Sequence, residues 1–177
     1  MVPFPNPLHP AVVHFPIAFV LLGAGLAVLA VLLRRWNLPL MVAILLVCGA
    51  AGAVVATSTG EEEAERLHEI SAAGEEVLEE HEDWGELTRN IAVVAALLAV
   101  AAAFAANKRV AGIVLSALTA AAALAAAYSV VQTGHYGGEL VYRHGAGVRA
   151  AADGAPSETA VSPSSSHEEK KNEEHGD

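Results

Sequence analysis

The chain has 177 residues, which is enough for one compact domain rather than two. Hydrophobic residues make up 54% of it and charged residues 17%, and the formal net charge of −10 argues against nucleic acid as a partner. The charge is absent from four long apolar stretches. Because none of these stretches has a polar face, they exclude a soluble helical bundle and indicate an integral membrane protein.

The four stretches predict four transmembrane helices. Roughly 20 helical residues are needed to cross about 30 Å of hydrocarbon, and a helix satisfies its own backbone polar groups there. The third stretch reaches this length only if Thr88 and Asn90 lie at the level of the lipid headgroups. The expected helices span residues 11–33, 38–58, 86–106 and 110–133.

Two prolines shape the start of the first helix. Pro10 suits the first turn, where a backbone donor is not needed. Pro16 removes the hydrogen bond to the carbonyl of Val12 and is expected to bend the helix around His14. The stretch is too long for the apolar region of a signal peptide and no basic residue precedes it, so we expect a retained helix.

An acidic, amphipathic segment separates the second and third helices. Between Gly60 and Trp84, apolar residues and His81 fall near one helical face and glutamates fall on the other. We expect one amphipathic helix, or two short ones with a break around 71–74, lying on the outer membrane surface. His81 then points toward the bundle and His68 toward water.

Small residues recur along the second and third helices. They are Gly49, Ala53, Ala56 and Gly60 on the second, and Gly85, Thr88, Ala92, Ala95 and Ala99 on the third. Small faces allow transmembrane helices to approach closely, but they would also leave room for a flat ligand. The sequence does not separate these two interpretations. The single cysteine, Cys48, falls in the middle of the second helix and is interpreted as a core residue.

The chain changes character after the fourth helix. Glycines in the segment 133–148 predict a tight turn with close backbone approach, followed by a short segment that returns over the outer surface. Residues 150–177 are rich in serine, alanine and charge, and we expect a disordered acidic tail after a membrane domain of residues 1–149. The tail carries His167 and His175, which we expect to be bystanders, as is His68.

Basic residues predict the orientation. Arg34, Arg35, Lys108 and Arg109 lie in the two short connections between helices, which contain no acid. By the positive-inside rule both connections are cytoplasmic and both termini are extracytoplasmic. The expected fold is therefore an all-α, antiparallel four-helix bundle in the membrane, with the acidic segment on its outer surface.

This topology gathers five histidines at one end of the bundle. They are His9 and His14 at the start of the first helix, His81 before the third, and His135 and His144 after the fourth. Neutral imidazole is a common ligand of haem iron, zinc and copper. Ionisable groups near the membrane are candidates for function because their burial is costly.

Several motifs resemble one bacterial family of membrane proteins, domain of unknown function 2231. The opening motif runs Leu8-His-Pro-Ala-Val-Val-His-Phe-Pro-Ile-Ala18. Shorter matches are Thr59-Gly-Glu-Glu-Glu-Ala-Glu65, His81-Glu82, Gly137-Gly-Glu-Leu-Val-Tyr142 and Gly145-Ala-Gly-Val148. The resemblance implies a small four-helix protein of the bacterial inner (plasma) membrane in which His9, His14 and His81 matter. It implies no particular activity.

One hypothesis for the histidine cluster is a haem b site for electron transfer. His14 and His81 are the expected axial ligands, with His135 in reserve. His9 and His144 would form hydrogen bonds to a haem propionate or to a ligand imidazole. The porphyrin would lie between the small faces of the second and third helices.

Two further hypotheses remain open. The same histidines, with Glu82 or Glu139, would suit zinc or copper. Alternatively, the protein is a non-catalytic subunit of a respiratory or other membrane complex, with the acidic segment as its docking surface. No nucleophile elbow, phosphate loop or zinc-protease motif is present in the sequence, which disfavours a free-standing enzyme. The oligomeric state is left open.

Overall fold

The computed structural model describes residues 8–33, 38–65 and 71–146, and these residues are helical with no strand. The elements are α1 (His9–Val12), α2 (His14–Leu33), α3 (Leu38–Ala64), α4 (Ala72–Phe104) and α5 (Arg109–His144). Four helical spans are long and apolar enough to cross a membrane, with α1 and α2 counted as one. The predicted all-α fold with four spans is confirmed.

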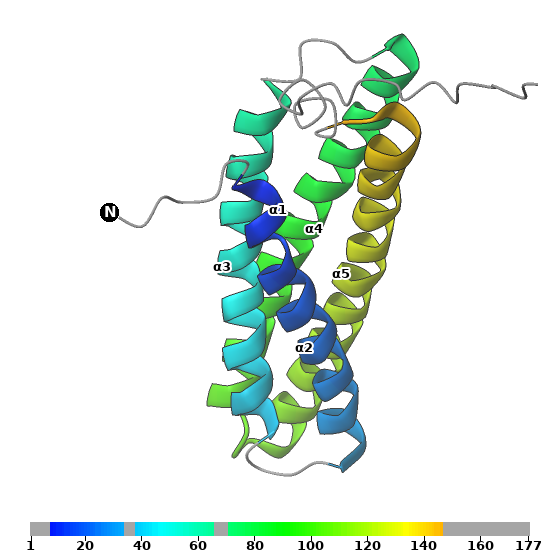
Figure 1. Ribbon diagram of the computed structural model, residues 1–177. Helices are drawn as coiled ribbons and strands as arrows, with labels where there is room; N and C mark the ends of the chain where they lie inside the picture. The colour runs from blue at the N-terminus through cyan, green and yellow to red at the C-terminus, as the bar shows by residue number, and fades with distance from the viewer. Residues whose placement is uncertain (1–7, 34–37, 66–70, 147–177) are drawn as a thin grey trace, which may run out of the picture.

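The helices lie side by side and nearly parallel to one long axis (Figure 1). In this view α2 and α4 descend while α3 and α5 ascend, and the contacts connect α2 with α3, α3 with α4, α4 with α5, and α5 with α2. One end of the bundle holds α1, the end of α3, the start of α4 and the end of α5; we call it the histidine end. The other, which holds the α4–α5 connection, we call the loop end. The predicted tail, His68, His167 and His175 lie outside the described residues.

The first span is interrupted at Val13, between α1 and α2. Pro10 lies in the first turn of α1, as predicted. The backbone N–H of Val13 donates to His9 O (3.1 Å) and that of Ile17 donates to Val13 O (3.3 Å). Pro16 lies between these two donors and has no N–H to offer the carbonyl of Val12. The interruption therefore falls where the proline predicted a bend.

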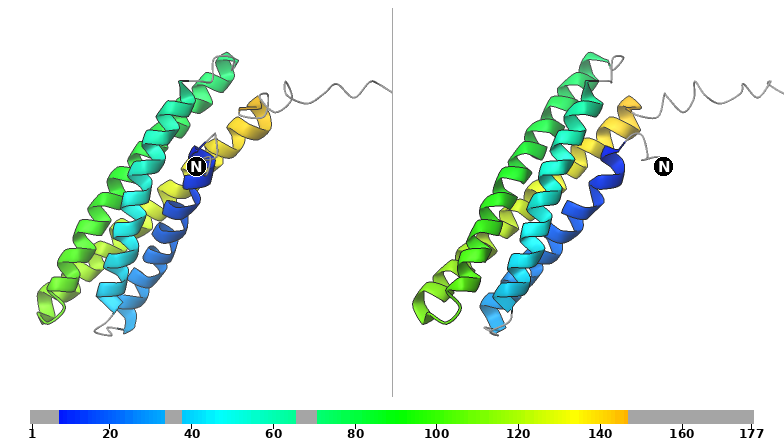
Figure 2. Two further views of the ribbon diagram at one scale, coloured as in Figure 1. Left: turned by 60° about the vertical axis from the view of Figure 1, so that its left-hand side comes forward. Right: turned by 90° about the vertical axis from the view of Figure 1, so that its left-hand side faces the viewer.

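In the described residues the acidic segment does not form a separate helix on the membrane surface, and that part of the prediction is wrong. Its first residues complete α3, and its last thirteen, 72–84, are the start of α4. Ser71 caps α4 by accepting a hydrogen bond from Gly74 N at 3.2 Å, within the predicted break. The glutamates mark where the chain leaves the hydrocarbon layer. They do not end the helix, because glutamate is a good helix former. Figure 2 shows α3 and α4 reaching beyond α1 at the histidine end.

The predicted turn at residue 133 is also wrong, because α5 continues to His144. Each of the glycines at 134, 137 and 138 lowers helix stability by about 1 kcal/mol relative to alanine, but none forbids a helix. The helix ends instead at Gly145, whose left-handed backbone (φ 67°) forms the cap. At 36 residues, α5 is about 54 Å long and extends well past a hydrocarbon layer of about 30 Å.

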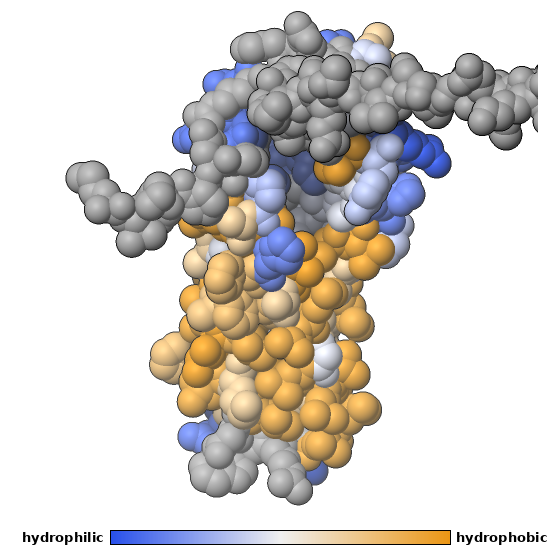
Figure 3. Space-filling model, viewed as in Figure 1, coloured by the Kyte–Doolittle hydropathy of each residue, from blue (hydrophilic) through white to orange (hydrophobic). Residues whose placement is uncertain are grey.

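Small side chains fill the interior of the bundle, and large apolar ones cover its surface. Most buried apolar residues are alanines, and the largest fully buried apolar side chains are Leu46 and Val20. By contrast, Leu32 is 71% exposed and Phe104 is 86% exposed. The apolar surface forms a broad belt with polar residues toward both ends (Figure 3). This inverted distribution suits a bundle whose solvent is lipid.

Candidate functional site

Two of the five candidate histidines meet inside the histidine end. The ring centroids of His9, on α1, and His81, on α4, lie 6.3 Å apart, and the rings are nearly perpendicular at 88°. Both side chains are half-buried. Because α1 packs on α3 and α4 packs on α5, the two rings face each other from different pairs of helices. The space-filling view shows a recess between α1 and the far part of α5 at this end (Figure 3).

His9 is held by the end of α3. Its Nδ1 lies 2.8 Å from Ala56 O and 3.4 Å from Thr59 Oγ1. Gly60 makes the approach possible, because a Cβ at this position would lie 3.0 Å from His9 Cε1. The chain thus needs a small residue directly beside the ring.

His81 is held in the same way by α5. Its Nδ1 lies 2.9 Å from Thr133 O, and a Cβ on Gly137 would lie 3.0 Å from His81 Cε1. The predicted close backbone approach near residue 137 is therefore present, although it occurs on a helix rather than in a turn.

The hydrogen bonds fix the chemistry of both rings. A carbonyl oxygen only accepts, so each Nδ1 carries a proton, and in the neutral ring Nε2 then carries the lone pair. Within the described residues neither Nε2 has a hydrogen-bond partner. No buried side-chain nitrogen or oxygen in these residues lacks a partner, so neither Nε2 is fully buried. Both Nε2 atoms are therefore left without a protein partner among the described residues. Metal-binding histidines have this arrangement, with the second ring nitrogen donating to a carbonyl or carboxylate.

A hydroxyl network fixes α4 against α5 one to two turns below His81. Thr88 Oγ1 lies 2.6 Å from Ser129 Oγ and 3.1 Å from Thr133 Oγ1. Thr133 Oγ1 also donates to Ser129 O at 2.9 Å, and Ser129 Oγ donates to Trp84 O at 3.4 Å. Thr88 and Ser129 are buried. The network holds the backbone of Thr133, and hence the carbonyl that orients His81.

The other three candidate histidines do not join this pair. His14 is exposed on the outside of the bundle, so it does not lie beside His81 as a ligand pair would require. The helix restarts at His14 after the interruption, and Pro16, two residues on, takes the buried position against Gly52. His135 is also exposed, with its Nε2 3.9 Å from Glu139 Oε2, and His144 is half-buried at the last turn of α5.

The small faces of α3 and α4 are used for helix packing. The residues concerned are buried: Gly49, Ala53 and Ala56 on α3, and Thr88, Ala92, Ala95 and Ala99 on α4. Each face packs against another helix: a Cβ on Gly49 of α3 would meet Val20 of α2, and Thr88 of α4 contacts Ser129 of α5. Of the two alternatives left open by the sequence, close packing applies here.

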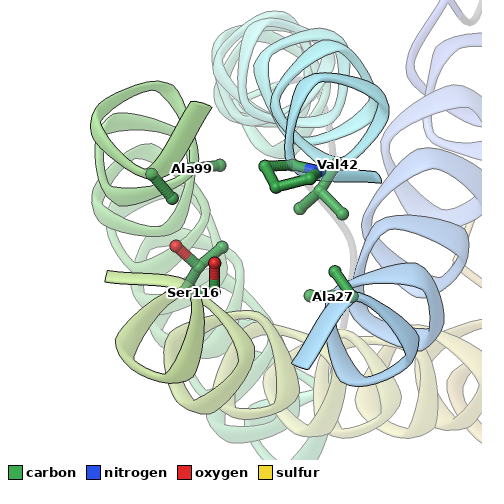
Figure 4. Close-up of a pocket in the computed structure, with 8 residues that line it drawn as sticks. Ala27, Val42, Ala99 and Ser116 are labelled. Atoms are coloured by element: carbon green, nitrogen blue, oxygen red, sulfur yellow. The ribbon is translucent and has the colours of Figure 1, made fainter. Parts of the chain in front are cut away.

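Two cavities lie toward the loop end and away from the histidines. One, of about 10 Å³, is lined by residues from all four spans, which are mostly small and include the hydroxyls of Ser116 and Thr119 (Figure 4). That volume is close to the least that one water molecule requires. The second is an open groove of about 550 Å³ between α3 and α4, and one of its walls includes Cys48, which is exposed rather than buried in the core.

A multi-ligand metal site is not assembled in the part of the chain that the structure describes. There, no three side chains of His, Cys, Asp and Glu gather closely enough to hold an ion. Glu82 is exposed, and Glu139 accepts an ion pair from Arg143 at 2.8 Å. What the geometry offers is a pair of imidazoles.

The sequence placed all five histidines at the same end of the bundle, but it favoured His14 rather than His9 as the partner of His81. It missed His9 as the neighbour of His81, and it missed the carbonyls of Ala56 and Thr133. A signal for the first was available, since Gly60 was already on the small face of its helix. Nothing in the sequence marked the carbonyls, because every residue has one.

Fold and site together define a multi-pass, all-helical membrane protein with a histidine pair at one end. The chain belongs to the family described as predicted membrane protein (DUF2231), whose model matches residues 5–150. No curated protein and no solved structure matches the chain. The family's description states no activity, so function has to be argued from the site.

Proposed function

We propose that the histidine end binds haem b through Nε2 of His9 and His81, and that the protein carries single electrons at this membrane surface. The observation that carries the proposal is the state of the two rings. They are neighbours, each is held by an Nδ1–H···O=C hydrogen bond, and neither Nε2 has a protein partner among the described residues. When bound there, haem would supply one-electron redox chemistry between a reduced and an oxidised partner.

Ligand number favours haem over a bare ion. Structural zinc sites use four protein ligands and catalytic ones use three, whereas porphyrin fills four positions of the iron and leaves two for protein. Two imidazoles with no third ligand among the described residues would suffice for haem but leave zinc or copper short of donors. Zinc or copper therefore stays the second choice for the same pair.

Binding requires a change in the two rings. They now lie edge to face, and His9 and His81 would have to turn both Nε2 atoms toward a shared haem in order to hold it. The carbonyls of Ala56 and Thr133 would keep each Nδ1–H during this change and strengthen the rings as ligands. The expectation that His14 pairs with His81 is replaced by His9, because His14 faces outward. His135 and His144 stay candidates for contacts to the propionates.

The test is an absorption spectrum of full-length protein purified in mild detergent from haem-replete cells, before and after dithionite. Wild type should show a Soret band that shifts on reduction. His9→Ala and His81→Ala should each lose most of it. His135→Ala is the matched control, since His135 is exposed, and it should keep the band; His14→Ala should keep it too.

The outcomes separate the ligands and the alternatives. Loss of the band in His14→Ala with retention in His9→Ala would restore His14 as the axial partner of His81. A colourless preparation whose metal content reaches one zinc or copper per chain, and falls in His81→Ala, would favour the bare ion. This measurement needs His167→Ala and His175→Ala in the background, so that the tail does not contribute.

A structural role is the second candidate, and one specific observation favours it. The two rings already connect helices, His9 joining α1 to α3 and His81 joining α4 to α5. In this case the protein is a subunit of a larger membrane complex, docked through the acidic ends of α3 and α4. Wild-type protein would then be colourless and metal-free, and His81→Ala would reduce its recovery in the complex on native gels.

A further inference from the structure

An open apolar groove runs between α3 and α4 at the loop end. Its volume is about 550 Å³. The walls are Leu40, Ala43, Ile44, Val47 and Cys48 of α3, and Val100, Ala103 and Phe104 of α4. None of these side chains is charged. From Leu40 to Cys48 the wall extends about 12 Å along the helix. A groove of this length suits an extended hydrocarbon chain better than a compact ligand.

The groove opens on the surface that faces lipid. Leu40 is 58% exposed, Ile44 55% and Phe104 86%. The neighbours of α3 and α4 in the bundle, α2 and α5, contribute no residue to its walls. The alanines of the lining, Ala43 and Ala103, are too small to fill the space between these larger side chains.

Positive charge lies just beyond the groove. Lys108 and Arg109 follow Phe104 by four and five residues, at the end of the connection between α4 and α5, and both are exposed. Among the described residues neither side chain has an ion-pair or hydrogen-bond partner. They begin α5, whose first turn has no acidic residue and no side-chain cap. The backbone amides of that turn add the positive end of a helix dipole.

We propose that this region is a binding site for one acidic phospholipid, with an acyl chain in the groove and the phosphate headgroup at Lys108, Arg109 and the start of α5. Basic residues at the membrane end of a helix pair are a recognised means of selecting anionic headgroups. A second copy of the chain fits less well, because a symmetric dimer over this groove would bring the same cations together. The proposal is independent of what the histidine pair binds.

The test is native mass spectrometry of full-length protein released from nanodiscs that hold equal amounts of phosphatidylglycerol and phosphatidylcholine with identical acyl chains. Wild type should retain one lipid per chain, with phosphatidylglycerol in excess. Removing each cation should lower that preference roughly fivefold, so Lys108→Gln with Arg109→Gln should abolish it. Ala103→Leu, which fills the groove, should reduce retention of both lipids.

Matched controls and contrary results complete the test. Arg143→Gln removes a cation at the other end of the bundle, and Ala117→Leu enlarges an exposed alanine outside the groove; both should behave as wild type. If circular dichroism shows that Ala103→Leu fails to fold, the double variant Lys108→Gln with Arg109→Gln still tests the proposal, because both side chains are exposed. Equal retention of the two lipids by wild type overturns the proposal, as does a dimer that Ala103→Leu dissociates.

Discussion

Gly137 offers a direct measurement of the contact that orients His81. In Gly137→Ala, the new Cβ would lie 3.0 Å from Cε1 and 3.2 Å from Nδ1 of His81. Ordinary contact begins near 3.4 Å, so the ring must move by about 0.4 Å or more. The ring is held by the 2.9 Å bond to Thr133 O, and His9 limits it on another side.

The expected free energies nearly cancel. Replacing a glycine inside a helix by alanine stabilises it by about 1 kcal/mol. Weakening one hydrogen bond and leaving its half-buried partners poorly satisfied costs about 1 kcal/mol. Gly137→Ala should therefore leave the free energy of unfolding almost unchanged. At Gly134 and Gly138 a Cβ would meet nothing within 4 Å, so alanine there should give the full gain.

The assay is reversible unfolding of full-length protein in mixed micelles, followed by circular dichroism, for the three alanine variants. The same substitutions are then made in a His81→Ala background. Without the imidazole, Gly137→Ala should stabilise as much as the two controls, which gives a coupling of about 1 kcal/mol between positions 81 and 137.

Two results would refute the reasoning. One is a gain for Gly137→Ala equal to that of Gly134→Ala in the wild-type background, which would mean that the ring is not confined. The other is a coupling to His81 that is indistinguishable from zero.

Two more predictions concern the elements that carry the site. Ser71→Ala removes the cap of α4 and should destabilise the helix by about 1 kcal/mol. Limited proteolysis should then cut faster at the start of α4, whereas Ser71→Asp should keep the wild-type rate of cleavage. Equal rates of cleavage for all three proteins would contradict the role of Ser71 as a cap. Thr88→Val keeps the side-chain shape but takes the 2.6 Å partner from buried Ser129, which should cost about 1–3 kcal/mol in the same unfolding assay. Thr57→Val, which removes an exposed hydroxyl bonded only to Val54 O, is the control; a similar loss in both variants would show that the buried network adds nothing.

The membrane fold could be predicted because it depends on local properties of the chain. A span of about 20 uncharged residues must be helical in lipid wherever it occurs, and the prolines at 10 and 16 act on their own helix. The helix ends were less predictable. Charge and glycine content mark where the chain leaves hydrocarbon, but α4 begins at Ala72 and α5 ends at His144 because capping by Ser71 and Gly145 decides the ends.

The histidine pair depended on tertiary structure. The sequence determined that five histidines approach one end of the bundle, since that follows from the number and direction of the spans. Which two meet depends on the rotation of each helix about its axis, and this is fixed by packing. Pro16, buried against Gly52, turns His14 outward. Gly60 and Gly137 admit the rings of His9 and His81, each facing a carbonyl of a neighbouring helix.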